Sequence, residues 1–161
     1  MKSFFGFIIL IISFLGANLP EIRKDYIAAN DAKETTEKLC LALESITKES
    51  EPILIAYKGA AATLRAKHSK GIKLKKGFFK EGVEYLEYSV EKAPKNIEIR
   101  CIRLSVQEHS PKILKYKKNI EEDKQFLMNN FNSTKDKAVQ KFVKDYVLQS
   151  SIFDAAEKKL F

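Results

Sequence analysis

The sequence has 161 residues, of which 45% are hydrophobic and 31% are charged. These proportions are typical of a globular protein, and they exclude collagen-like chains, low-complexity tails and disulfide-dense mini-scaffolds. Its 29 Lys and Arg residues against 21 Asp and Glu residues give a net charge of +8, which favours anionic partners.

The N-terminus has the pattern of a secretory signal peptide. One lysine precedes an apolar run over residues 4–15, and Gly16 and Ala17 follow it. We therefore predict that residues 1–17 are a signal peptide cleaved after Ala17, and that residues 18–161 form a single all-helical domain exported to the periplasm or the cell exterior. The apolar run is shorter than the roughly 20 residues that span a bilayer. An uncleaved N-terminal signal anchor is the alternative.

Apolar residues recur at three- and four-residue spacings along residues 18–161, a pattern that predicts helices almost throughout. In chain order we expect a helix over residues 20–29 and a second helix that starts near residue 31. Further helices are expected over residues 52–68, 74–92, 97–108, 121–130, 134–149 and 151–160, with a short helical turn after Pro111. Side chains that commonly cap helices precede several of these segments, at Asp31, Asn96, Ser133 and Ser150.

Successive helices of this length joined by short turns imply an all-α fold built as an array of antiparallel helical hairpins. Residues 57–96 resemble one hairpin of the tetratricopeptide repeat family. The resemblance rests on Tyr57, Gly59, Gly82, Leu86, Ser89 and the pair Ala93-Pro94. The connection between the two helices is longer than the family pattern, and the chain contains no Trp. The resemblance implies an αα superhelix whose concave face binds a peptide or protein segment, and an irregular bundle is the alternative architecture.

The chain lacks the side-chain patterns of the common catalytic and metal sites. Its two histidines, His68 and His109, belong to no HExxH or similar motif, and GxSxG, Walker and GxGxxG sequences are absent. We therefore predict a protein with no enzymatic activity, no metal and no cofactor.

Cys40 and Cys101 admit two interpretations. An exported protein meets oxidising conditions, and a disulfide closing this long loop would stabilise the fold by about 4 kcal/mol. Alternatively, the two residues are separate small hydrophobic side chains, because they fall on the core-facing sides of helices that need not touch. The sequence leaves both open.

Basic residues gather in one stretch without acidic residues, 52–80. We define the basic patch as Arg65, Lys67, Lys70, Lys73, Lys75, Lys76 and Lys80, and a second lysine cluster follows over residues 112–118. Such a patch is typical of a surface that meets anionic lipid headgroups, cell-wall polymers or an acidic protein. The alternative is a solvated helix end whose lysines provide solubility. Nucleic acid is disfavoured as a partner, because the protein is predicted to be exported and few aromatic residues alternate with these lysines.

Arg100, Arg103 and Gln107 form a polar stripe on an otherwise apolar predicted helix. A buried arginine needs a carboxylate or a ligand anion, because an unpaired buried charge is costly. The structural interpretation is an ion pair with a carboxylate of the preceding helix, from Glu84, Glu87 or Glu91. The functional alternative is a groove that grips a ligand carboxylate and is lined by Tyr57, Lys58, Arg100, Arg103 and Gln107.

Two functions therefore stay open. The first is an exported helical scaffold, without catalytic activity, that binds a protein or peptide through this groove. The second is a basic envelope protein that binds a polyanion or a membrane surface through its lysines.

Overall fold

The computed structural model describes residues 18–161, and the predicted signal peptide lies outside this range. Within residues 18–161 the chain forms eight α-helices and two short 3-10 helices, with no strand. These elements are, in chain order, α1 (Leu19–Ala29), α2 (Lys33–Ala42), α3 (Pro52–His68), α4 (Ile72–Lys92), α5 (Ile97–His109), η1 (Lys112–Leu114), α6 (Ile120–Asn130), η2 (Phe131–Ser133), α7 (Lys137–Gln149) and α8 (Ala155–Lys158). The prediction of an all-α fold is confirmed.

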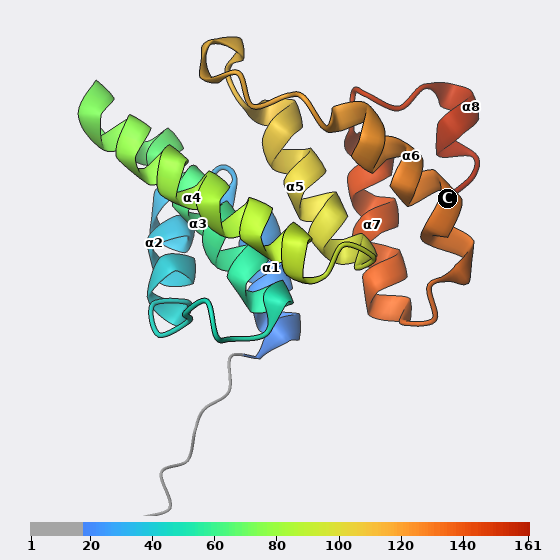
Figure 1. Cartoon of the computed structure of the whole chain (residues 1–161), viewed down its shortest axis with the longest axis horizontal. Helices are drawn as coiled ribbons and strands as arrows, with labels where there is room; N and C mark the ends of the chain where they lie inside the picture. Colours follow the sequence, from blue (N-terminus) through green and yellow to red (C-terminus); the bar gives the residue numbers. More distant parts are fainter. Residues whose placement is uncertain (1–17) are drawn as a thin grey trace, which may run out of the picture.

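The helices pack as antiparallel neighbours along the chain. α1 lies against α2, α3 against α4, and α5 against α6, and the most extensive of these contacts joins α3 and α4. Figure 1 shows α5 between the group α1–α4 and the group α6–α8, so this helix connects the two halves of the molecule. The predicted arrangement of antiparallel helical hairpins is therefore present.

α5 is the most buried helix because its apolar residues point to several sides. Ile99, Ile102 and Leu104 are fully buried, and the helix contacts α3, α4, α6 and α7. Its start is fixed by Asn96, as the sequence predicts: the Asn96 side-chain oxygen accepts hydrogen bonds from the backbone N–H groups of Glu98 and Ile99, at 3.0 and 3.1 Å. Polar residues on such a helix need partners inside the protein, and these partners define the candidate site.

The start of α2 differs from the prediction. Asp31 does not cap this helix, which begins at Lys33 after Ala32 and has no side-chain cap. Thr36, in the first turn, is buried and donates its hydroxyl hydrogen to the Ala29 carbonyl at 2.9 Å. This contact ties α2 to the end of α1.

The last two helices also begin later than predicted, because carboxylates cap them instead of the predicted serines. Asp136 caps α7, and its side chain accepts a hydrogen bond from the Ala138 N–H at 2.8 Å. Asp154 caps α8 in a capping box with Glu157. A carboxylate at a helix start also interacts favourably with the helix dipole, which a serine hydroxyl does not do to the same extent.

Candidate functional site

The residues of the predicted ligand groove are occupied by contacts within the protein. On α3, the Tyr57 hydroxyl is buried and donates to Glu98 Oε1 at 2.6 Å. Its neighbour Lys58 donates to the backbone carbonyls of Glu44 and Ile46, in the connection between α2 and α3. Burial and the nearby carboxylate of Glu98 raise the pKa of Tyr57, so the phenol stays protonated and donates this bond.

The two arginines of α5 meet a carboxylate that the sequence reading did not name. Asp123, in the first turn of α6, is fully buried. Arg103 binds it through two parallel hydrogen bonds of 2.7 Å, from Nε to Oδ2 and from Nη2 to Oδ1. Arg100 Nη1 donates to the same Oδ1 atom at 2.8 Å and also pairs with Glu122. This two-pronged geometry is the strong form of an arginine–carboxylate pair.

Other polar atoms of this stripe also have partners within the protein. Arg103 Nη1 donates to Glu87 Oε2 at 3.0 Å, so one of the three predicted carboxylates of α4 does take part. The Gln107 side-chain oxygen accepts from the Asn119 N–H at 3.0 Å. Burial disfavours the charged form of Arg103, but its bonds to Asp123 outweigh burial and raise the pKa. The stripe is thus an ion network that joins α4, α5 and α6.

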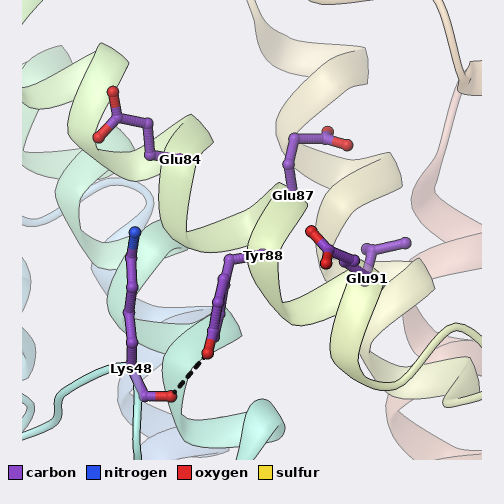
Figure 2. A pocket seen from close by; sticks show the side chains of 6 residues that line it. Lys48, Glu84, Glu87, Tyr88 and Glu91 are labelled. Atoms are coloured by element: carbon purple, nitrogen blue, oxygen red, sulfur yellow. Dashed lines mark hydrogen bonds between the residues drawn. The ribbon is translucent and has the colours of Figure 1, made fainter.

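A row of carboxylates follows the outer face of α4. Glu84, Glu87 and Glu91 border a surface hollow with Tyr88 and Lys48, and Tyr88 donates its hydroxyl hydrogen to the Lys48 carbonyl at 3.1 Å. Figure 2 shows the three carboxylates spread along the helix and pointing in different directions, not converging on one point. Within residues 18–161, no group of three or more His, Cys, Asp or Glu side chains is arranged to hold a metal ion.

Three members of the basic patch lie against other parts of the protein. Arg65 Nη2 lies 3.2 Å from Glu37 Oε2. Lys67 Nζ donates to the Asn30 carbonyl at 2.7 Å. Lys80 Nζ approaches the carboxylate four residues further along α4 at 4.0 Å. Each of these three side chains therefore has a polar contact within the protein.

The other members of the patch are Lys70, Lys73, Lys75 and Lys76, which are all exposed. None of them has a carboxylate within 4.0 Å among the residues that the structure describes. They belong to the segment 70–76, which we call the α4 tip. α4 begins at Ile72, two residues before the predicted start, and Figure 1 shows this end extending past the helices packed beneath it.

The α4 tip is also apolar. The exposed fractions of Ile72 and Leu74 are 74% and 57%, although both side chains belong to a well-formed helix. The tip extends past the helices beneath it in Figure 1, which agrees with the high exposure of both side chains. The sequence reading identified the lysines here and missed the exposure of the two aliphatic residues between them.

The second lysine cluster lies in the connection between α5 and α6, residues 111–118, which we call the η1 loop. Its turn is closed by backbone hydrogen bonds from Leu114 N–H to the Pro111 carbonyl and from Lys115 N–H to the Lys112 carbonyl, both at 3.0 Å. The loop carries Ile113, whose exposed fraction is 87%. Figure 1 shows the η1 loop, drawn in gold, projecting from the same edge of the molecule as the α4 tip.

The cysteines are both free thiols in the structure. Cys40 is half-buried on α2 and approaches the Ala61 carbonyl at 3.6 Å. Cys101 is fully buried on α5. Burial raises the pKa of both thiols.

No family model matches this chain, and neither does any curated protein or solved structure. The resemblance of residues 57–96 to a tetratricopeptide repeat hairpin therefore stays a prediction. Among the helices of residues 18–161, none combines the length and apolar character that crossing a bilayer requires.

Proposed function

We propose that this protein binds anionic surfaces through the α4 tip. The observation that carries the proposal is a set of exposed lysines on a helix end that projects from the molecule, Lys73, Lys75 and Lys76. None of them has a carboxylate within 4.0 Å among residues 18–161. In the same patch, Lys67 and Lys80 each lie within 4.0 Å of an acidic side chain. The tip lysines instead leave their charge available to a partner.

The position of these lysines supports a binding role over a stabilising one. The N-terminus of a helix carries a partial positive charge, so a lysine in the first turn, such as Lys73, destabilises the helix, typically by about 0.3–1 kcal/mol. The first turn of α4 contains no acidic residue to offset this repulsion. The helix dipole and the lysines therefore add up to a concentrated positive field at the tip, which attracts anions.

The other predicted function, a scaffold that grips a peptide carboxylate, has less support from the described residues. Arg100 and Arg103 already hold Asp123, and the Tyr57 hydroxyl holds Glu98. A ligand would have to displace these buried partners, and separating a buried ion pair costs several kcal/mol. The α4 tip needs no such rearrangement.

Binding to anionic vesicles and to heparin tests the proposal. Near an anionic membrane each lysine contributes about 1 kcal/mol. The triple variant Lys73→Gln, Lys75→Gln, Lys76→Gln should therefore lose roughly a hundredfold in affinity for vesicles that contain phosphatidylglycerol. Binding of the unchanged protein should fall as salt rises, because salt screens exposed charges. Mass spectrometry identifies the first residue of each preparation, so that all the variants compared have the same N-terminus.

A matched control separates the tip from net charge. Lys24, Lys33 and Lys135 are exposed, form no ion pair among the described residues and lie on or beside other helices. Changing these three to Gln removes the same charge and should weaken binding much less. Equal losses in the two triple variants would show that only net charge matters and would contradict the proposal.

A further inference from the structure

Two neighbouring projections carry three of the seven large hydrophobic side chains that are exposed among the described residues, including the two most exposed. Among the described residues, Ile113 and Ile72 are the two most exposed large hydrophobic side chains, at 87% and 74%, and Leu74 is 57% exposed. Ile72 and Leu74 lie on the α4 tip, and Ile113 lies on the η1 loop. Covering these side chains with an apolar partner would remove their apolar surface from water and so stabilise the complex.

The two projections are connected by specific contacts at their bases. Phe79 of α4 packs edge to face on Tyr116 of the η1 loop, with ring centroids 5.9 Å apart. The Tyr116 hydroxyl donates to Glu87 Oε1 at 2.6 Å, two turns further along α4. Phe79 lies seven residues after Ile72, or about 10 Å along the helix axis. The α4 tip and the η1 loop therefore form neighbouring prongs on one edge of the molecule, as Figure 1 shows.

Both prongs carry lysines around their aliphatic side chains. On the η1 loop, Lys112, Lys115 and Lys118 are exposed, and none has a carboxylate within 4.0 Å among the described residues. No acidic residue occurs within either the α4 tip or the η1 loop. The edge thus combines exposed aliphatic side chains with exposed lysines from the same two segments.

We propose that this edge docks on an anionic phospholipid bilayer, with Ile72, Leu74 and Ile113 entering the headgroup–acyl boundary and the surrounding lysines contacting the lipid phosphates. The inference rests on the proposed function and names its partner. Aliphatic side chains that enter this boundary contribute binding free energy because their apolar surface leaves water. Adjacent lysines add to it through attraction to the anionic headgroups. A hydrophilic polymer such as a cell-wall polyanion can pair with the lysines but has no apolar region to bury the aliphatic side chains. An anionic bilayer provides both interactions.

A comparison of two ligands separates this inference from the general proposal. The variant Ile113→Ser and the double variant Ile72→Ser, Leu74→Ser keep every lysine. Each should bind heparin as the unchanged protein does and should bind phosphatidylglycerol vesicles about tenfold more weakly per side chain removed. Unchanged vesicle binding in both variants would overturn the bilayer inference and leave anionic-surface binding intact. If the unchanged protein bound neither heparin nor the vesicles, both the bilayer inference and the proposed function would be overturned.

Tryptophan fluorescence then reports insertion directly, because the chain contains no Trp. Ile113→Trp and Leu74→Trp place a single reporter on each prong. Leu41→Trp is the matched control: Leu41 is 69% exposed on α2, beside Glu34, Glu37 and Lys38. On addition of phosphatidylglycerol vesicles, the emission of the two prong reporters should shift to shorter wavelength and be quenched by brominated lipids, while that of the control should not. Equal responses at position 41, or none at 74 and 113, would contradict the inference.

Discussion

Gly59 of α3 and Gly82 of α4 lie against each other's backbone where the two helices cross. A Cβ atom at Gly59 would stand 2.7 Å from the Gly82 carbonyl oxygen, and one at Gly82 would stand 2.5 Å from the Gly59 carbonyl oxygen. Real Cβ atoms do not approach oxygen this closely, so both positions require a residue without a side chain. The crossing sets the distance between the helices that support the α4 tip.

The substitution Gly82→Ala is therefore expected to destabilise the protein. The new methyl group would also meet Thr63 Cγ2 at 2.6 Å, and overpacking of this kind costs about 1–3 kcal/mol. Urea denaturation followed by circular dichroism measures the change in the free energy of unfolding. Gly77→Ala is the control on the same helix. Among the described residues, no atom beyond its own stretch of helix lies within 4 Å of its Cβ position, so alanine there should stabilise by about 0.5–1 kcal/mol. Similar effects at both positions would contradict the close approach.

The closeness of these helices was partly predictable from sequence. The run of small residues from Gly59 to Ala62 indicates a helix face that another helix can approach, and the third helix begins and ends at the predicted residues, Pro52 and His68. Apolar spacing and proline position are local properties, so they are readable without knowledge of the fold. Which glycine of the neighbouring helix lies opposite depends on the register between helices, and no local pattern encodes that register.

The ion network predicts a large penalty for removing its buried carboxylate. Asp123 is fully buried, and the side chain of Arg103 is only 4% exposed. Asp123→Asn would leave the positive charges of Arg100 and Arg103 without their main partner, which typically costs about 3–5 kcal/mol. Thermal or urea unfolding measures this loss.

The control for this prediction is Glu122→Gln, one residue earlier. Glu122 also pairs with Arg100, but its side chain is 52% exposed, so the loss should stay below about 1 kcal/mol. A smaller effect at Asp123 than at Glu122 would contradict the assignment of Asp123 as the centre of the network.

For the arginine stripe, the sequence predicts that carboxylate partners are needed but does not identify the main one. The need for carboxylate partners followed from placing Arg100 and Arg103 on an apolar helix. Glu87 of α4 was among the predicted partners and does contact Arg103. The main partner, Asp123, comes from α6, whereas the predicted partners all lie on the preceding helix. Asp123 lies four residues before the buried Leu127 and so faces the core, which is the one signal that would have indicated it.

The contacts of Glu108 predict that the free energy of unfolding depends on pH. It joins the ends of α5 and α7, since its carboxylate accepts hydrogen bonds from the Tyr146 hydroxyl at 2.8 Å, the Ser150 hydroxyl at 2.9 Å and the Ser151 N–H at 2.8 Å. Burial alone would raise the pKa of Glu108, but these bonds outweigh burial and lower the pKa below its ordinary value of 4.5.

Because the folded pKa lies below the unfolded one, Glu108 stabilises the fold fully above about pH 4.5, and the contribution is lost as the pH falls through the folded value. Glu108→Gln should therefore cost about 1–2 kcal/mol at pH 7 and less at pH 3, measured by urea denaturation at both pH values. Glu91→Gln, on an exposed carboxylate of α4, should change little at either pH. A penalty for Glu108→Gln that grows on acidification would have the wrong sign for this assignment.

The two cysteines give the last prediction, because their environments differ. Cys40 is half-buried and Cys101 is fully buried, with burial raising the pKa of both thiols. Only thiolates are readily alkylated, so the folded protein should react slowly at Cys40 and more slowly still at Cys101. In denaturant without reductant, mass spectrometry should find both cysteines alkylated. Absence of adducts would reveal a disulfide, and faster reaction of Cys101 than of Cys40 in the folded protein would contradict the burial of α5.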